Sequence, residues 1–297
     1  MPNLLSEANY LLSTIYAKFL SSLFLEVEIQ TPVETANDIL HNNKSLVRFG
    51  DGELEWLDEN HVANFQVGNK DLANDLRTII QRKEDKLLIG VPNAIVQQSN
   101  LSLTEKKWWR KWLARNVMNI RLYVNHGSFA STNFSRPYIM YKYHEYSDDV
   151  FQIIKKIFNK KEIVIIEGDQ TRFGVGNDIL NGAQNVQRII CPSRNAYSKK
   201  KEILNFVRTS ISNSSDTLVL LSLGPTATVL GSILFDDGFQ VIDIGHADLE
   251  YEWFCRQDEV KTNLKYKGVN EVDGGYVVED LPNHIKEKYE SEIIKVI

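Results

Sequence analysis

The stretch "TLVLLSLGPTATVLGSIL" (217–234) decides the fold. It begins with an almost continuous run of Leu and Val and then changes to a helical pattern. Such a run is typical of a strand that is buried on both faces of a parallel sheet. Pro225 suits the first helical turn, where its missing N–H would have had no partner. The stretch therefore predicts a strand, a tight turn and a helix.

The same alternation of strand and helix patterns extends over the rest of the chain. Candidate strands are 45–49, 86–91, 120–124, 162–168, 186–190, 217–224 and 239–245. Candidate helices lie near 33–41, 52–60, 70–83, 103–115, 147–159, 198–211, 226–236 and 248–257. Alternation of this kind predicts βαβ units, and hence an α/β fold with a mostly parallel sheet flanked by helices. No repeat, low-complexity tract or clear linker divides the chain.

Charge and cysteine content narrow the class of protein. The chain has 34 basic and 39 acidic residues, a net charge of −5, so the general basic field of a nucleic-acid-binding protein is absent. Local arginines and helix N-termini could still bind anionic ligands. Cys191 and Cys255 form no CxxC pair, which argues against a disulfide framework or a cysteine zinc site and favours reduced thiols in a cytoplasmic protein.

The N-terminal 30 residues form a separate feature. No signal peptide is visible, and the apolar stretch 10–29 is interrupted by Lys18 and several serines, so it does not predict a spanning helix. Its apolar side chains recur at helical spacing and predict an amphipathic helical extension over 1–30. We expect this helix to pack on the domain. The alternative is an interfacial helix that makes peripheral contact with the inner face of the membrane, near a lipid-linked substrate.

Ligands of open α/β sheets bind beyond the carboxyl ends of the strands, so the residues that follow each strand are the candidates for a site. The stretch "SLVRFGDGELEWL" (45–57) places Asp51 and Glu53 in such a turn. The two acids could simply favour the helix that follows, with Asp51 as its N-cap. Alternatively they could hold Mg²⁺ or Mn²⁺, which prefer carboxylate and phosphate oxygens.

The neighbours of these acids suit a phosphate ligand. Gly50 and Gly52 would let a diphosphate approach the backbone closely. Arg48 could meet a phosphate or pair with an acid.

The stretch "EGDQTRFGVGNDIL" (167–180) follows another strand and resembles the start of a dinucleotide fingerprint. Ile179 stands where the third glycine belongs, and Arg194 and Asn195 stand where the acidic residue is expected. A nicotinamide site is therefore weakly supported. Arg172, in a loop that we expect to run into a helix, could clamp an anion or lie on the surface.

Two further strand ends carry polar groups. Gly224, Pro225 and Thr226 form a helix N-terminus suited to phosphate, or simply a good strand-to-helix turn. "VIDIGHADLEYEWF" (241–254) contributes His246, with Asp248 and Glu250 close behind. These could act as base or metal ligands, or form a capped helix with a solvated acidic face.

A fifth stretch, 125–143, combines Ser135 and Arg136 with many aromatic residues. Arginine and aromatic faces suit a sugar or base ring, and they also suit an ordinary packed loop.

Six motifs occur along the chain in an order that resembles a known family, the bacterial GT-D type glycosyltransferases, once described as a domain of unknown function. They are "RFGDGE", "SRPY", "EGDQTRFGVGND", "CPSRNAY", "LGPTATVL" and "DIGHADLEYEW". The resemblance covers about residues 31–275. It implies a Rossmann-like core, a single domain over 31–297, and a divalent metal, Mn²⁺ or Mg²⁺, held by a DxE motif that is here Asp51 and Glu53.

The resemblance also implies transfer of a sugar, with UDP-glucose as the expected donor, onto a lipid-linked or protein-linked glycan of the bacterial surface. Catalytic roles are expected of His246, Asp248 and Glu250, without a choice of base among them. The expected substrate-binding residues are Arg48, Gly50, Gly52, Ser135, Arg136, Glu167, Arg172, Asn177, Asn195, Gly224, Pro225 and Thr226. A homodimer is the common default for such a protein.

Two other classes remain as alternatives. One is a non-catalytic nucleotide-binding α/β protein, and the other is a metal-dependent phosphohydrolase.

Overall fold

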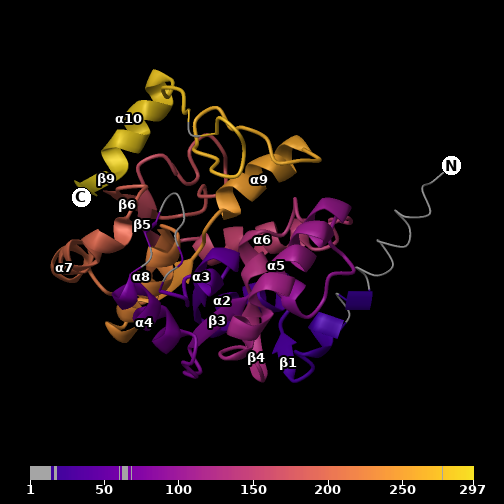
Figure 1. The fold of residues 1–297 in the computed structure, drawn as a ribbon. Coiled ribbons are helices and arrows are strands. Elements are labelled where there is room, and N and C mark those ends of the chain that lie inside the picture. The colour runs from indigo at the N-terminus through magenta and orange to yellow at the C-terminus, as the bar shows by residue number, and fades with distance from the viewer. Residues whose placement is uncertain (1–14, 17–18, 60, 62–65, 68, 276) are drawn as a thin grey trace.

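The computed structural model describes residues 15–16, 19–59, 61, 66–67, 69–275 and 277–297. In that part of the chain nine strands form one sheet, in the order β1-β4-β3-β2-β8-β7-β5-β6-β9 (Figure 1). The strands are β1 (Val27–Ile29), β2 (Ser45–Arg48), β3 (Leu87–Val91), β4 (Gly127–Ser131), β5 (Glu162–Gly168), β6 (Asn185–Cys191), β7 (Thr217–Ser222), β8 (Gln240–Asp243) and β9 (Ile293–Val296). All neighbouring strands pair in parallel, which confirms the predicted α/β fold class.

Helices connect the strands and cover both faces of the sheet (Figure 1). They are α2 (Pro32–Asn42), α3 (Asp51–Glu55), α4 (Lys70–Ile79), α5 (Leu103–Arg121), α6 (Ser147–Phe158), α7 (Lys200–Ser210), α8 (Pro225–Asp236), α9 (Ala247–Arg256) and α10 (Asn283–Glu292). Short 3₁₀ turns lie at η1 (Asn93–Ile95), η2 (Thr132–Ser135) and η3 (Ala196–Lys199).

Alternation along the central strands separates two cores. In β7, Leu218 and Leu220 join the large core that also contains the apolar face of α6. Val219 and Leu221 point to the other face, into a second core with α7 and α8. Successive side chains of a strand point to opposite faces, so an unbroken apolar run is what a doubly covered strand requires.

The sheet consists of two halves that meet between β2 and β8. From β2 the chain proceeds to β3 and β4 on one side, and β5 to β8 lie on the other side. Leu46 of β2 is in register with Ile242 of β8 at this boundary. A boundary of this kind leaves a crevice at the carboxyl ends of the strands, where ligands of open sheets bind.

Three predicted local features are wrong. The expected strand at 120–124 is not one, because α5 continues to Arg121 and keeps Leu113, Val117 and Ile120 buried at helical spacing. The strand of that region is β4, which begins at Gly127.

The loop after β5 also differs from expectation, because it forms turns instead of entering a helix. Arg172, Gly174 and Gly176 all have positive φ angles there, which a right-handed helix does not accommodate. In the turn after β2, the predicted N-cap Asp51 is wrong: the N-cap of α3 is Gly50, and Asp51 is the first helical residue.

Most of the predicted N-terminal helix lies outside the described residues. Within them, residues 19–22 are helical, and Leu20 and Phe24 are buried in the large core. β1 pairs with β4, so the sheet begins before the predicted domain boundary at residue 30.

No helix in the described part of the chain combines the length and apolar character that a bilayer span requires.

Candidate active site

A cleft of about 910 Å³ lies at the carboxyl ends of the strands. Its walls come from the segments that follow β2 to β8, from the first half of α5 and from a loop over residues 261–271. The predicted site residues in its lining are Arg48, Gly50, Asp51, Gly52, Glu53, Arg136, Gly224, Pro225, His246 and Asp248. The fold therefore gathers at one place the motifs that were far apart in the sequence.

The turn after β2 presents the two acids of the DxE motif to this cleft. Oε2 of Glu53 accepts a hydrogen bond from the Gly50 amide at 3.0 Å, which caps the short helix α3. Asp51 is exposed. Burial and the nearby Asp243 carboxylate raise the pKa of Glu53 to about 7, against the opposing charge of Arg48. A cation beside these carboxylates would relieve that repulsion, so capping and metal binding are compatible here.

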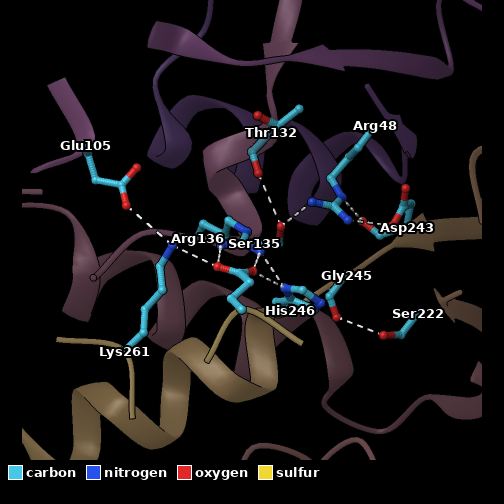
Figure 2. A network of polar contacts seen from close by, with 11 residues as sticks. Arg48, Glu105, Thr132, Ser135, Arg136, Ser222, Asp243, Gly245, His246 and Lys261 are labelled. Atoms are coloured by element: carbon cyan, nitrogen blue, oxygen red, sulfur yellow. Dashed lines mark hydrogen bonds and ion pairs between the residues drawn. The ribbon is translucent and has the colours of Figure 1, made fainter. Parts of the chain in front are cut away.

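Arg48 joins the two halves of the sheet beneath the cleft (Figure 2). Its Nε and Nη2 donate to the carbonyl and Oδ1 of Asp243, both at 2.8 Å, and its Nη1 donates to the Ser135 hydroxyl at 2.6 Å. Each nitrogen of the guanidinium thus donates a hydrogen bond to another residue of the protein. Gly245 has a φ of +48°, and a Cβ at that position would lie 1.9 Å from Nη2 of Arg48. Only glycine leaves room for this arrangement.

A second charged network lies beside His246 (Figure 2). Glu271 forms ion pairs with Arg136 and with Lys261, the latter at 2.7 Å. Nδ1 of His246 lies 2.9 Å from Oε1 of Glu271 and also contacts Arg136. Burial opposes ionisation of Glu271, but Arg136 and the hydrogen bond from His246 outweigh it and hold the Glu271 pKa well below its usual range.

The surroundings of His246 favour its uncharged form. Its burial, followed by the positive charge of Arg136, lowers its pKa. An ionised Glu271 can accept a hydrogen bond from the Nδ1–H of a neutral imidazole, which leaves the lone pair of Nε2 free to act as a base.

Asp248 lies deeper in the cleft wall. Its Oδ1 accepts a hydrogen bond from Asn177 at 2.7 Å, and its Oδ2 lies 2.7 Å from the ammonium of the buried Lys267. Lys267 also pairs with Glu252 at 2.9 Å. This carboxylate is therefore balanced by a buried cation, and Asn177 supports it from outside the cleft lining.

The N-terminus of α8 completes the floor of the cleft. Gly224 and Pro225 line it, and Thr226, Ala227 and Thr228 of α8 are buried behind them. Thr226 is buried, and its hydroxyl has no hydrogen-bond partner among the described residues. The Thr228 hydroxyl donates to the Arg48 carbonyl at 2.7 Å, which fixes the helix to β2. Unpaired amides at a helix N-terminus attract an anionic ligand to this floor.

The structure does not bring every predicted residue to the cleft. Glu167 is fully buried and pairs with Arg188 at 2.7 Å. The left-handed backbone of Arg172 directs its guanidinium away, and Nη1 donates to the carbonyls of Tyr266 and Glu279. Oδ1 of Asn195 accepts from the Val67 amide. Glu250 is buried behind the cleft, where its Oε2 accepts from the amides of Tyr138 and Ile139.

Several cleft residues were not predicted. Glu105 and Trp108 of α5 form one wall, Ser193 and Arg194 follow β6, and Glu271 comes from the loop after α9. The side chain of Trp108 is 43% exposed. Ser193 and Arg194 both stand in the "CPSRNAY" motif, which was the sequence signal that pointed to this part of the cleft.

The donor set suits a hard cation that shares its ligands with a substrate. In the described part of the chain no cluster of three or more His, Cys, Asp or Glu side chains could enclose a metal ion. Asp51 and Glu53 instead offer two carboxylates at an open cleft. Mg²⁺ and Mn²⁺ are typically held in this way, with phosphate oxygens completing the coordination.

A parallel α/β domain with paired carboxylates and a helix N-terminus in one cleft at its strand ends is an architecture suited to an enzyme that acts on a phosphorylated substrate. The family model for the glycosyltransferase GT-D fold matches residues 46–272, more than half of the chain. The chain therefore belongs to the GT-D glycosyltransferase family.

Two streptococcal relatives and two solved structures agree with this assignment. The chain is 31% identical over 269 residues to "Glycosyltransferase GlyD" of Streptococcus pneumoniae serotype 4, with 90% of this chain and 32% of the relative covered. It is 32% identical over 270 residues to "Probable glycosyl transferase Gly" of Streptococcus gordonii, with 91% and 39% covered. The chain thus spans about a third to two fifths of the length of these relatives.

Among solved structures, a "highly conserved domain of unknown function 1792" with "a distinct glycosyltransferase fold" matches with a TM-score of 0.85 and 32% identity, covering 96% of this chain and 99% of that one. "A New Glycosyltransferase (DUF1792) from Streptococcus sanguinis" matches with a TM-score of 0.84 and 32% identity, covering 91% and 99%.

Proposed function

We propose that this chain is a metal-dependent glycosyltransferase that moves a sugar, with glucose from UDP-glucose as the expected donor, onto a glycan acceptor of the bacterial surface. One observation carries the proposal. The DxE carboxylates, the N-terminus of α8 and His246 come from three different strand ends, and together with Glu271, the partner of His246, they line the same cleft. A glycosyl transfer uses a counter-charge and hydrogen-bond donors for the diphosphate, and a transfer that inverts the sugar also uses a base for the acceptor hydroxyl.

The donor diphosphate is assigned to the floor of the cleft. The amides at the start of α8 and the guanidinium of Arg194 supply positive potential there, and Gly50 and Gly52 leave space near the carboxylates. Asp51 and Glu53 would hold Mn²⁺ or Mg²⁺, which supplies charge neutralisation to the departing diphosphate. Arg48 acts on this site by positioning, since its guanidinium holds Asp243 and Ser135.

The acceptor is assigned to the side of the cleft that carries His246. We propose that Nε2 of His246 takes the proton of the acceptor hydroxyl, while Glu271 holds the imidazole through Nδ1. Trp108, exposed in the lining of the cleft, offers an aromatic face on which a sugar ring can lie. Asp248 and Glu250 support this side of the cleft as buried groups.

The test is turnover of UDP-glucose with Mn²⁺, measured as release of UDP and free glucose, which needs no acceptor. Asp51→Asn and Glu53→Gln should each lower the rate at least about a hundredfold, as expected when a leading electrostatic stabiliser is removed. UDP should raise the melting temperature much more with Mn²⁺ than with a chelator.

Glu59→Gln is the matched control, because Glu59 is an exposed carboxylate on the same segment outside the cleft lining. Its turnover should equal that of the wild type. Equal thermal shifts with and without metal would contradict the metal role. Binding of UDP without any turnover would favour a nucleotide-binding protein, and release of phosphate from simple esters would favour a phosphohydrolase.

A further inference from the structure

Helix α5 has a charge opposite to that of the chain as a whole. Between Leu103 and Arg121 it carries six basic side chains and one acidic one, a net charge of +5, whereas the chain has a net charge of −5. The one acid, Glu105, already pairs with Lys261. Positive charge is thus concentrated on a single element of an otherwise acidic molecule.

The exposed part of this charge forms one row. Lys107, Lys111 and Arg115 are spaced four residues apart, so they lie one above the other on the same side of the helix. All three are exposed, and none forms a salt bridge with any residue that the structure describes. Like charges at this spacing destabilise a helix, so the row is unfavourable for folding alone and is better explained by an anionic partner.

Large apolar side chains flank this row and are also exposed to solvent. Leu103 is 64% exposed, Met118 70% and Leu122 72%. Leu103 precedes Lys107 by one turn, and Met118 and Leu122 continue the row beyond Arg115. We call this surface, made of Leu103, Lys107, Lys111, Arg115, Met118 and Leu122, the basic face of α5.

We propose that the basic face of α5 binds the surface of a bilayer that contains anionic lipids. The lysines and the arginine reach the headgroup phosphates, and the leucines and Met118 enter the boundary between headgroups and acyl chains. Nucleic acid would use the cations but not the three exposed apolar side chains. A twofold contact with a second copy would set one cationic row against another.

The proposed contact has a consequence for the cleft. Trp108 belongs to the same helix and lines the cleft, so a bilayer on the basic face lies beside its mouth. If the proposed glycosyl transfer holds, this geometry favours an acceptor sugar carried on a lipid. The membrane contact itself does not depend on the enzyme activity and is tested separately.

The experiment is cosedimentation of the full chain with phosphatidylcholine vesicles that contain or lack phosphatidylglycerol, at low and high salt. We expect binding only to the anionic vesicles, weakened by salt. Lys107→Glu/Lys111→Glu should reduce it at least about tenfold, because each basic side chain near an anionic surface contributes substantially. Met118→Ser/Leu122→Ser should reduce the vesicle binding that remains at high salt, because that binding depends on the apolar side chains.

The matched control is Lys286→Glu/Lys288→Glu, the same change of charge on exposed positions of α10 (Asn283–Glu292), which lies at the upper-left edge of Figure 1, away from α5. It should bind like the wild type. Melting curves and UDP-glucose turnover in solution establish that each variant is folded.

Three results would overturn the proposal. They are no pelleting with anionic vesicles, an equal loss in the α10 control, and a dimer that Met118→Ser/Leu122→Ser abolishes in a chain that does not bind vesicles.

Discussion

Glu250 illustrates how the environment of one residue sets its chemistry. Its carboxyl group is fully buried, with Oε2 held by the amides of Tyr138 and Ile139 at 3.1 and 2.9 Å. Oε1 has no hydrogen-bond partner among the described residues. Burial raises the pKa of Glu250 to about 7, although Arg136 opposes the shift. The group therefore changes its charge near neutral pH, within a wall of the cleft.

This pKa shift makes the stability of the protein depend on pH. The pKa of Glu250 is about 7 when folded and about 4.3 when unfolded, so between these values the folded state alone holds the proton. The contribution of Glu250 to stability is therefore present at low pH and is lost as the pH rises towards 7. Glu250→Gln removes this titration and keeps the shape.

We expect the free energy of unfolding of Glu250→Gln, relative to that of the wild type, to increase by about 2–3 kcal/mol between pH 5 and pH 8, because only the wild type loses stability over this range. Urea unfolding at the two pH values measures it. Glu53, whose pKa is also raised to about 7, is present in both proteins and cancels in the comparison. A difference between the two proteins that stays constant with pH would contradict the shift.

Individual site residues could be predicted where a strand end fixed their place. Asp51, Glu53 and His246 follow strands directly, and each lines the cleft. The direction of a side chain in a loop was not predictable. Arg172 turns away because of its left-handed backbone, and Glu271 reaches His246 from a loop whose course depends on tertiary contacts.

Among the elements, α8 packs closely on the sheet at one position, Gly231. Gly231 faces β2, and a Cβ there would lie 2.8 Å from Cγ1 of Val47 and 3.2 Å from Cδ1 of Leu221. All three residues are in fixed, buried positions. The glycine is therefore required by close approach and not by its backbone angles.

Gly231→Ala should lower the free energy of unfolding by about 1–3 kcal/mol, the usual cost of overpacking a core. The intrinsic gain of alanine over glycine in a helix, about 1 kcal/mol, works in the opposite direction and is included in that net estimate. Thermal or urea unfolding measures the loss.

A second substitution provides the control for the contact itself. Val47→Ala removes Cγ1, so adding it to Gly231→Ala should cost less than Val47→Ala costs in the wild type. If the two losses simply add, the contact with Val47 is not the cause.

Some helices and strands could be predicted from the sequence more clearly than others. The central strands β5 and β7 are continuous apolar runs, and their predicted bounds agree closely with the structure. β4 reads "GSFAS" and has exposed residues in its first half, so it carries no such signal. The run "IRLYV" looked like a strand because of its composition, but the burial of Ile120 at helical spacing keeps its first residues in α5. Tertiary packing decided these cases.

At the scale of the whole molecule, Arg48 connects the two halves of the sheet. It comes from β2, and its partner Asp243 ends β8, on the other side of the boundary at which the cleft opens. The side chains are 15% and 4% exposed. Burial raises the pKa of Asp243, and Arg48 counters that effect. The pair thus joins the stability of the fold to the shape of the cleft.

Arg48→Met should lower the free energy of unfolding by about 3–5 kcal/mol, because it leaves the Asp243 carboxylate buried without a counter-charge. Adding Asp243→Asn removes that charge, so Arg48→Met/Asp243→Asn should be more stable than the sum of the two single losses by about 1–3 kcal/mol. The destabilisation by Arg48→Met should also depend on pH, for the same reason. Without Arg48 the folded Asp243 holds a proton more tightly than the unfolded chain does, so Arg48→Met should lower the free energy of unfolding less at pH 5 than at pH 8. Urea unfolding of the four proteins at both pH values tests this. Strict additivity, or a loss that does not vary with pH, would mean that the Arg48–Asp243 ion pair does not hold the two halves of the sheet together at this boundary.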